Sequence, residues 1–277
     1  MSAWLSQFLE IPVAAAPSSS GGSRSLYCII DSVRQPHALE QLYQQSDLNG
    51  VEKLFQDTPF SEMNDVSPLW LQLKPGSAAA TKAIELCREN RSGMLLTSSD
   101  TPANALLHAR RLLRMNSQSY GDSLARFYDP AFWSALAMTA PAQALYGPWE
   151  SVHTPPAHVE DQNWRTWERP HDANGAKDEF RYPLQLHDDT LAAFDEIRWW
   201  YWIRSREAES ANGLPDSELP VVSENLQLLV DHGIDEGRHL ERLLPQLRRS
   251  PLQERTDAMN VLSSEMPAFE KVQRLEV

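Results

Sequence analysis

Three ionisable residues in the C-terminal part of the chain have the spacing of ligands on one helix face. His232, Glu236 and His239 are four and three positions apart, so on a continuous helix they would share a face. Imidazole and carboxylate groups bind zinc and iron, and Glu236-x-x-His239 resembles half of a carboxylate-bridged di-iron site. The alternative is a solvated acidic face, because so short a match is weak evidence. A metal-dependent hydrolase is therefore one candidate function, but we favour the solvated face and expect no metal and no cofactor.

Other familiar catalytic patterns are missing from the sequence. The chain has no GxSxG, HExxH, GxGxxG or GxxxxGK[ST] motif, which are the patterns of serine hydrolases, zinc proteases and nucleotide-binding loops. A second Glu-x-x-His, Glu150 to His153, falls in a region that we predict to be a turn. Cys28 and Cys87 lie in separate apolar runs, which is typical of buried, reduced thiols. We assign no catalytic residue and expect the protein not to be an enzyme.

Asp31, Arg126 and Asp129 lie at the ends of predicted strands. Functional sites of α/β sheets gather at strand ends, so the two carboxylates could be catalytic. A structural ion pair between Arg126 and either Asp31 or Asp129 is the favoured interpretation, because a guanidinium group matches a carboxylate with two parallel hydrogen bonds.

The most unusual segment of the chain is Ile197-Arg-Trp-Trp-Tyr-Trp-Ile203. On a helix its apolar side chains form two stripes about 100° apart, whereas a surface helix needs one. The second stripe requires a partner or a covering segment, and Trp and Tyr are the residues that anchor interfaces. Complete burial within the chain is the alternative. The interface hypothesis assigns binding to Ile197, Trp199, Trp200, Tyr201, Trp202 and Ile203.

The composition is that of a globular protein with a strong acidic bias. The chain has 277 residues, of which 42% are hydrophobic and 23% charged, and its net charge is -13. An acidic surface repels phosphate backbones and anionic lipids, so we expect no nucleic-acid partner. No apolar run is long enough for a membrane span, and the N-terminus lacks the pattern of a secretory signal. We therefore expect a cytoplasmic protein without membrane insertion.

Hydrophobic periodicity divides the chain into four regions. Residues 1–25 are an amphipathic stretch and a Ser/Gly linker, and the stretch could dock on the body or on a partner. Residues 26–150 alternate strands and helices, which predicts a layered α/β lobe, with strands at 26–30, 51–55, 69–73, 94–97 and 123–129. We interpret residues 151–185 as an irregular Pro-rich connection. Residues 186–277 form a mainly α-helical lobe, with helices over 188–209, 218–247 and 251–266.

The α/β region carries an ordered set of motifs that resembles a known family. The motifs are LYCIID at 26–31, LFQDTP at 54–59, VSPLWLQL at 66–73, GMLLTSS at 93–99, a Leu/Arg helix at 106–114, RFYDPAFW at 126–133 and LYGPWE at 145–150. Together they resemble the domain of unknown function found in effector chaperones, or adaptors, of the bacterial type VI secretion system. The most specific piece is Arg126-Phe-Tyr-Asp-Pro130, which is similar to the family's RxYDP element.

This resemblance implies a binding function. Such proteins hold a toxic effector in the cytoplasm, keep it soluble and help load it onto the spike protein VgrG. The aromatic helix would then contact the effector. The resemblance supplies no catalytic residues, and we take Asp31, Arg126, Tyr128, Asp129 and Pro130 as scaffold positions. An immunity-like protein that binds and neutralises a toxin is a further alternative.

Overall fold

A computed structural model describes residues 3–17, 24–117, 121–170, 183–207, 214–215, 217–248 and 250–276. The chain divides into two compact units. The first comprises Gln7–Ile197, and the second comprises Met1–Ser6 with Arg198–Val277. We call them the sheet unit and the helical unit.

The sheet unit is built on a seven-stranded sheet with the order β1-β9-β8-β5-β2-β4-β3. Its strands are β1 (Val13–Ala15), β2 (Ser25–Ile30), β3 (Glu52–Lys53), β4 (Leu69–Leu73), β5 (Gly93–Ser98), β8 (Trp149–Thr154) and β9 (Asn163–Glu168). Every neighbouring pair in this sheet is antiparallel. A smaller sheet has the order β10-β6-β7, formed by β10 (Leu184–Leu186), β6 (Arg114–Ser117) and β7 (Gly121–Leu124).

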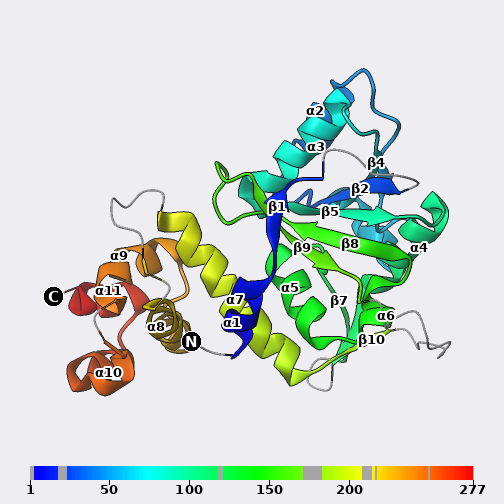
Figure 1. Ribbon diagram of the computed structural model, residues 1–277. Helices are drawn as coiled ribbons and strands as arrows, with labels where there is room; N and C mark the ends of the chain where they lie inside the picture. The colour runs from blue at the N-terminus through cyan, green and yellow to red at the C-terminus, as the bar shows by residue number, and fades with distance from the viewer. Residues whose placement is uncertain are drawn as a thin grey trace. The chain divides into compact units, whose positions relative to one another are not determined.

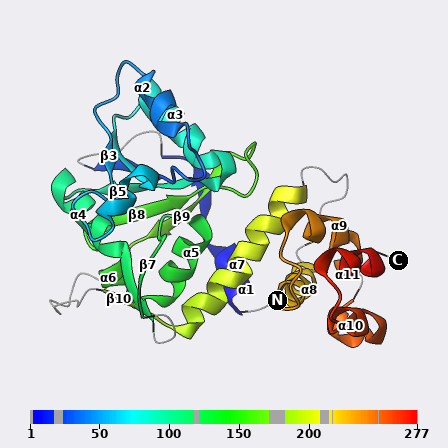
Figure 2. The same cartoon turned by 180° about the vertical axis from the view of Figure 1, so that it is seen from behind.

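Helices cover both faces of the large sheet (Figures 1 and 2). One face carries α2 (Ala38–Tyr43) and α3 (Ala78–Arg88), and the other carries α4 (Pro102–Leu112), α5 (Pro130–Thr139) and α6 (Ala142–Tyr146). Short 3-10 helices connect these elements at η1 (Ser61–Val66) and η2 (Glu89–Arg91). The predicted layered lobe of strands and helices is confirmed, with an antiparallel sheet as its centre.

β2 is an interior strand of the large sheet, between β5 and β4, and its side chains alternate between the two faces. Leu26, Cys28 and Ile30 point to the face that packs on α2 and α3. Tyr27 points to the other face, where its ring stacks on Trp70 at 5.0 Å between centroids. A strand covered on both faces shows a continuous apolar run in the sequence, which is the pattern that predicts it.

The prediction of irregular structure over residues 151–185 is wrong where β8 and β9 lie. Both strands contain polar residues, which interrupt the apolar pattern that predicts a buried strand. Ser151 and His153 of β8 are 3% and 8% exposed, and they bond laterally to hydroxyl groups of β5 and β9. A buried polar side chain is tolerated when it is hydrogen-bonded, and such partners come from distant parts of the chain. Residues 171–182 of the predicted connection lie outside the described residues.

The prediction of a strand over residues 123–129 is wrong in its second half. β7 ends at Leu124, and the backbone NH of Asp129 donates to the carbonyl of Arg126 at 2.9 Å in a turn. Asp129 then caps α5. An Asp followed by Pro favours the start of a helix, which is the local signal that the strand prediction overlooked.

The N-terminal stretch forms α1 (Ala3–Glu10), and the chain after it docks on β9. Phe8 is fully buried, with the Arg165 guanidinium 3.9 Å from its ring centroid. Arg165 also donates to the carbonyl of Phe8 at 2.8 Å. Val13–Ala15, at the start of the predicted linker, pair with β9 as strand β1. Of the two docking alternatives, the structure shows Phe8 and β1 on the body of the same chain.

The helical unit contains the second half of α7 (Asp188–Glu207), followed by α8 (Leu219–Asp231), α9 (Gly237–Leu247), η4 (Leu252–Glu254), α10 (Thr256–Leu262) and α11 (Ala268–Leu275). The predicted mainly α-helical C-terminal region is confirmed. The single helix predicted over 218–247 is wrong, because the chain breaks at Gly233, whose φ of +81° is a left-handed conformation that favours glycine.

Two buried polar residues hold the ends of these helices. Asn225 donates to the carbonyls of Leu247 and Ser250 at 2.9 and 3.0 Å and accepts from the backbone NH of Leu252 at 2.7 Å. Lys271 donates to the carbonyls of His232 and Leu262 at 3.2 and 2.8 Å. Carbonyl groups at helix C-termini lack partners within the helix, and these contacts satisfy them.

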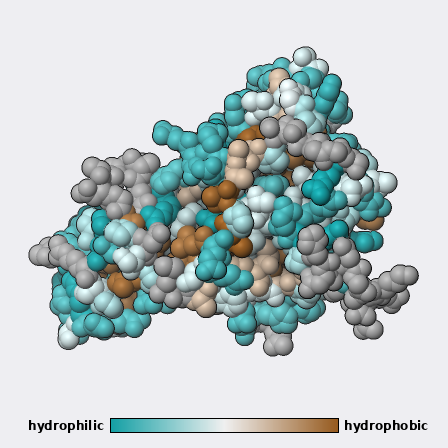
Figure 3. Space-filling model, in the orientation of Figure 1, coloured by the Kyte–Doolittle hydropathy of each residue, from teal (hydrophilic) through white to brown (hydrophobic). Residues whose placement is uncertain are grey.

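The surface agrees with the charged composition. Hydrophilic residues cover most of the face drawn in Figure 3. None of the described helices combines the length and apolar character that crossing a membrane requires.

Candidate functional site

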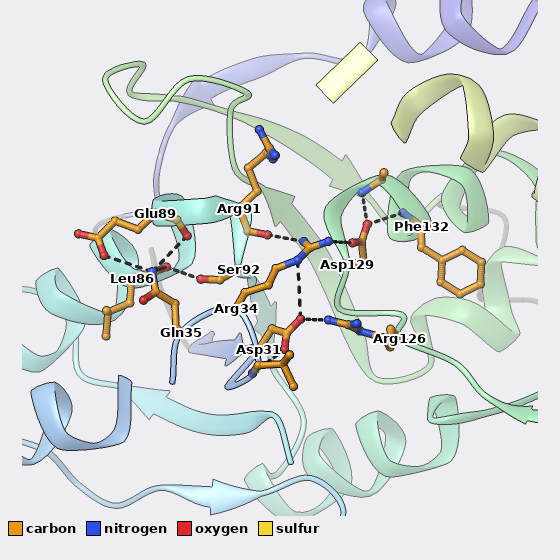
Figure 4. A network of polar contacts seen from close by, with 12 residues as sticks. Asp31, Arg34, Gln35, Leu86, Glu89, Arg91, Ser92, Arg126, Asp129 and Phe132 are labelled. Atoms are coloured by element: carbon orange, nitrogen blue, oxygen red, sulfur yellow. Dashed lines mark hydrogen bonds and ion pairs between the residues drawn. The ribbon is translucent and has the colours of Figure 1, made fainter. Parts of the chain in front are cut away.

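The motif residues meet in a polar network that joins three loops of the sheet unit (Figure 4). Asp31 follows the end of β2, and Arg34 lies in the turn after it. Arg126 and Asp129 come from the turn before α5. The Asp31–Arg126 and Arg34–Asp129 contacts each join residues 95 positions apart, so the network fastens the start of the unit to its middle.

Asp31 is the buried centre of this network, with 2% of its surface exposed. One carboxylate oxygen, Oδ1, accepts from the backbone NH of Val33 at 3.0 Å. The other, Oδ2, is bonded to Nη2 of Arg126 and lies 3.9 Å from Nε of Arg34. Two cations and a backbone donor compensate the burial of this charge, as a buried carboxylate requires.

Asp129 has two roles at the start of α5. Its Oδ1 accepts from the backbone NH groups of Ala131 and Phe132 at 2.9 and 3.2 Å, which makes it the N-cap. Its Oδ2 accepts from Nη2 of Arg34 at 2.5 Å. Pro130 occupies the first helical position, where a missing NH has no consequence. The Asp-Pro pair of the motif therefore begins the helix, and the free carboxylate oxygen binds the β2 loop to it.

The loop after β2 also holds the turn at the end of α3. Arg34 donates from Nη1 to the carbonyl of Arg91 at 2.9 Å. Gln35 donates to the carbonyls of Leu86 and Glu89 at 3.4 and 3.3 Å. Arg91 has a φ of +49°, a conformation that costs free energy for a residue with a side chain. The bond from Arg34 fixes the carbonyl of this strained turn.

Burial and charge act in opposite directions on the pKa of Arg126. Burial alone lowers it, but the hydrogen bond and the charge of Asp31 outweigh burial, so the pKa is raised. Burial, followed by the charge of Asp31, raises the pKa of the Tyr128 hydroxyl. Tyr128 is 3% exposed and packs edge-to-face on Phe127 at 5.6 Å. These groups stay in one charge state near neutral pH, which suits a scaffold.

The structure distinguishes between the alternatives for these residues. The predicted ion pair of Arg126 is confirmed, with Asp31 as its bonded partner. Asp129 pairs instead with Arg34, a residue that the sequence reasoning missed. The available signal was the spacing of Asp31 and Arg34, three positions apart in one turn. Each oxygen of both carboxylates accepts at least one hydrogen bond from the protein, so the arrangement positions loops.

The three residues considered as candidate metal ligands do not share a helix face. His232 is the C-cap of α8, Glu236 is the N-cap of α9, and His239 lies buried in the first turn of α9. The break at Gly233 separates them, which overturns the spacing argument. Across the part of the chain that the structure describes, no group of three or more His, Cys, Asp or Glu side chains could hold a metal ion.

His153, from the second Glu-x-x-His, lies in a row of hydroxyl groups within the large sheet. Its Nε2 is 3.0 Å from Oγ of Ser151, and its Nδ1 is 3.1 Å from Oγ1 of Thr166. Ser151 continues the row to Thr97 at 2.7 Å. Burial lowers the pKa of His153 to about 4, so the imidazole is neutral at pH 7. This row connects β5, β8 and β9 and accounts for the polar residues of these strands.

The aromatic segment lies on α7, and burial divides its six residues. Ile197 of the sheet unit is fully buried. In the helical unit Trp199, Tyr201 and Ile203 are at most 6% exposed, while Trp200 and Trp202 are half-buried. The binding assignment of the six stays a prediction, and the two half-buried tryptophans have the most area available for it.

Contacts within the helical unit fix the ring of Trp202. Trp199 donates from Nε1 to Oε1 of Gln227 at 3.0 Å and packs edge-to-face on Trp202 at 5.9 Å. Arg206 lies 5.2 Å from the Trp202 ring and donates to Glu241 at 2.6 Å. Side chains held in one conformation lose little entropy on binding, so this ring is pre-organised.

Comparison with curated proteins and with solved structures gave no match. A family model, however, matches most of the sheet unit. The matched region begins at β2 and ends with α6, and it includes Asp31, Arg126 and Asp129. Residues 26–146 match the family model described as Domain of unknown function (DUF4123).

Proposed function

We propose that the protein is a chaperone or adaptor of a type VI secretion system. It binds a cognate effector in the cytoplasm, keeps that effector soluble and helps load it onto the VgrG spike. The observation that carries the proposal is the DUF4123 match over residues 26–146, because this domain is associated with effector chaperones of that system.

The geometry of the motif residues supports a binding role. Asp31 and Asp129 are held by arginines and backbone donors, and these contacts favour a rigid platform. A rigid platform lowers the entropy lost when a partner binds. In this proposal the domain is the common scaffold, and recognition of one particular effector comes from surfaces attached to it.

Charge and aromatic area support an effector-binding surface in the helical unit. The net charge of -13 suits a basic or amphipathic segment of a partner and opposes self-association. Trp200 and Trp202 are half-buried, and partly exposed tryptophans are frequent anchors of interfaces. The proposed contact of the effector is this part of α7.

The first test is affinity purification of the tagged full-length chain from its native cytoplasm, with partners identified by mass spectrometry. We expect a toxin-like protein in near one-to-one amount, with or without VgrG. Recovery of no partner under both low-salt and high-salt washes would contradict the proposal.

Co-expression then separates a chaperone from an immunity-like protein. The candidate effector is produced alone and together with this chain, and its soluble fraction, its activity and its delivery by the secretion system are measured. A chaperone raises the soluble fraction and is required for delivery. An immunity-like protein blocks the activity of the toxin and leaves delivery unchanged, and that result would replace the proposed function.

A further inference from the structure

A pocket of about 740 Å³ lies in the sheet unit, apart from the motif network. One wall is a single face of α4, with residues spaced three and four positions apart. The other wall comes from the loop after β5, the turn before β8 and the end of β9. The lining residues are Ser99, Asp100, Asn104, Leu107, His108, Arg111, Gly147, Pro148 and Arg169.

The floor of the pocket is held by close packing of β8 against α4. Gly147 has a φ of +49°, and a Cβ added to it would lie 2.5 Å from the His108 ring. Only glycine allows this approach. His108 donates from Nε2 to the carbonyl of Leu145 at 2.9 Å, and Trp149 packs edge-to-face on its ring at 4.7 Å. These contacts fix the imidazole and the turn before β8 as one surface.

The described lining residues carry more positive than negative charge, in a strongly acidic protein. Arg111 and Arg169 contribute guanidinium groups, and Asp100 contributes a carboxylate. Asp100 accepts from the backbone NH of Thr101 at 2.6 Å and from Nδ2 of Asn104 at 2.9 Å. These donors, from its own loop and from α4, compensate part of the negative charge of Asp100.

Arg169 is positioned by a backbone contact. Its Nη1 donates to the carbonyl of Gly147 at 3.0 Å, which places the guanidinium at the wall formed by the turn. Arg111 lines the pocket from α4, one turn after Leu107. Two guanidinium groups that line one pocket from different elements are suited to an oxyanion, because a guanidinium group is a planar fork of donors that matches its oxygens.

We propose that this pocket binds an oxyanion, the carboxylate or phosphate group of a ligand, between Arg111 and Arg169. Its volume of about 740 Å³ is within the range of about 300–1,000 Å³ typical of ligand sites, so the ligand is larger than the anion alone. Leu107, which is 46% exposed, offers an apolar contact for the rest of the ligand. This site is independent of effector binding, because it rests on different residues.

The test uses the full-length protein, with three probes at constant ionic strength: inorganic phosphate, citrate and a tetra-aspartate peptide. Chemical shifts of the backbone amides of Asn104, Leu107 and Gly147 are followed by NMR. We expect at least one probe to give saturable shifts at these amides. Phosphate alone indicates a phosphorylated ligand, and citrate or the peptide indicates a small or a peptide carboxylate.

Substitutions assign the binding to the pocket. Arg111→Gln should weaken the affinity by about tenfold or more, because it removes a charged hydrogen-bonding partner. Arg111→Lys keeps the charge and should weaken it less. Arg114→Gln is the matched control, because it removes the same charge just after α4 but does not line the pocket. The amide spectrum of each variant reports whether it is folded.

Two results would overturn the proposal. One is the absence of saturable shifts at these three amides with every probe. The other is an equal loss of affinity in Arg111→Gln and Arg114→Gln, which would mean that the probes respond to general charge.

Discussion

The two units stabilise their buried polar groups in different ways. In the sheet unit, charged side chains pair with each other across long stretches of sequence, as Asp31 does with Arg126 and Asp129 with Arg34. In the helical unit, single side chains satisfy backbone groups, as Asn225 and Lys271 do at helix ends. A paired arrangement specifies two residue types at once, whereas a helix end accepts many donors. This difference explains physically why recognisable motifs lie in the sheet unit and ordinary apolar periodicity describes the helical unit.

The largest expected effect is the loss of stability of the sheet unit at low pH. His108 and His153 belong to the sheet unit, and burial lowers the pKa of each to about 4. The unfolded chain has ordinary histidine pKa values near 6.5, so it binds more protons than the folded chain between these values. The stabilisation is complete above pH 6.5 and is lost as the pH falls towards 4. We expect a loss of about 5 kcal/mol for the two histidines between pH 7 and 4.5.

Urea unfolding at several pH values measures this loss. His153→Asn should show a shallower dependence on pH than the unchanged chain, whatever its stability at pH 7. An identical dependence would show that His153 does not contribute. Titration of His108 by NMR gives an independent value, and a folded-state pKa near 6.5 would contradict the expectation.

Removal of both cations from Asp31 tests the paired network. The double variant Arg34→Ala, Arg126→Ala leaves a carboxylate that is 2% exposed without a positive partner. Loss of the partners of a buried charge is strongly destabilising, and because both arginines are partly exposed we expect about 3 kcal/mol. The free energy of unfolding in urea measures it.

A third substitution shows whether charge is the cause. Adding Asp31→Asn to the double variant removes the unpaired charge and should recover part of the stability, because a neutral amide loses less on burial. If the triple variant is less stable than the double variant, the carboxylate is not the source of the loss.

Asn225→Ala tests the helical unit in the same way. It removes one buried side chain that makes three hydrogen bonds to the backbone, so we expect a loss of about 2 kcal/mol. Hydrogen exchange should increase at Leu252 and along α8, while amides of β2 keep their protection. Glu224→Ala, an exposed position on the same helix, is the control. Faster exchange along β2 would show that the two units unfold together.

The smallest expected effect concerns the aromatic segment and rests on the proposed function. Trp200→Ala and Trp202→Ala should each weaken effector binding by about tenfold, or about 1.4 kcal/mol, the scale of an interface anchor. Calorimetry with the purified effector measures it. Phe269→Ala is the matched control, because Phe269 is an aromatic residue of the helical unit that is 53% exposed. Unchanged affinity in both folded tryptophan variants would remove these residues from the binding surface.

Local sequence patterns predicted the structure correctly where the residues of one segment are enough to determine its conformation. The apolar runs at residues 26–30, 69–73 and 94–97 became β2, β4 and β5, because strands covered on both faces are mostly apolar. The Asp129-Pro130 pair is likewise a local signal, and α5 begins at Pro130. The pairing of Arg126 with a motif carboxylate was also predictable, since few other partners suit a guanidinium group at a strand end.

Only the tertiary structure decided features that depend on distant partners. The polar strands β8 and β9 are buried because hydroxyl groups and His153 satisfy each other across three strands. Asp129 bonds to Arg34 because folding joins residues 95 positions apart. The pocket between α4 and Arg169 likewise exists only after the sheet has formed. By itself the sequence determined the central strands, the helical character of the C-terminal part and the motifs of residues 26–146. Packing decided which polar groups could be buried, because burial is stable only when a partner is present.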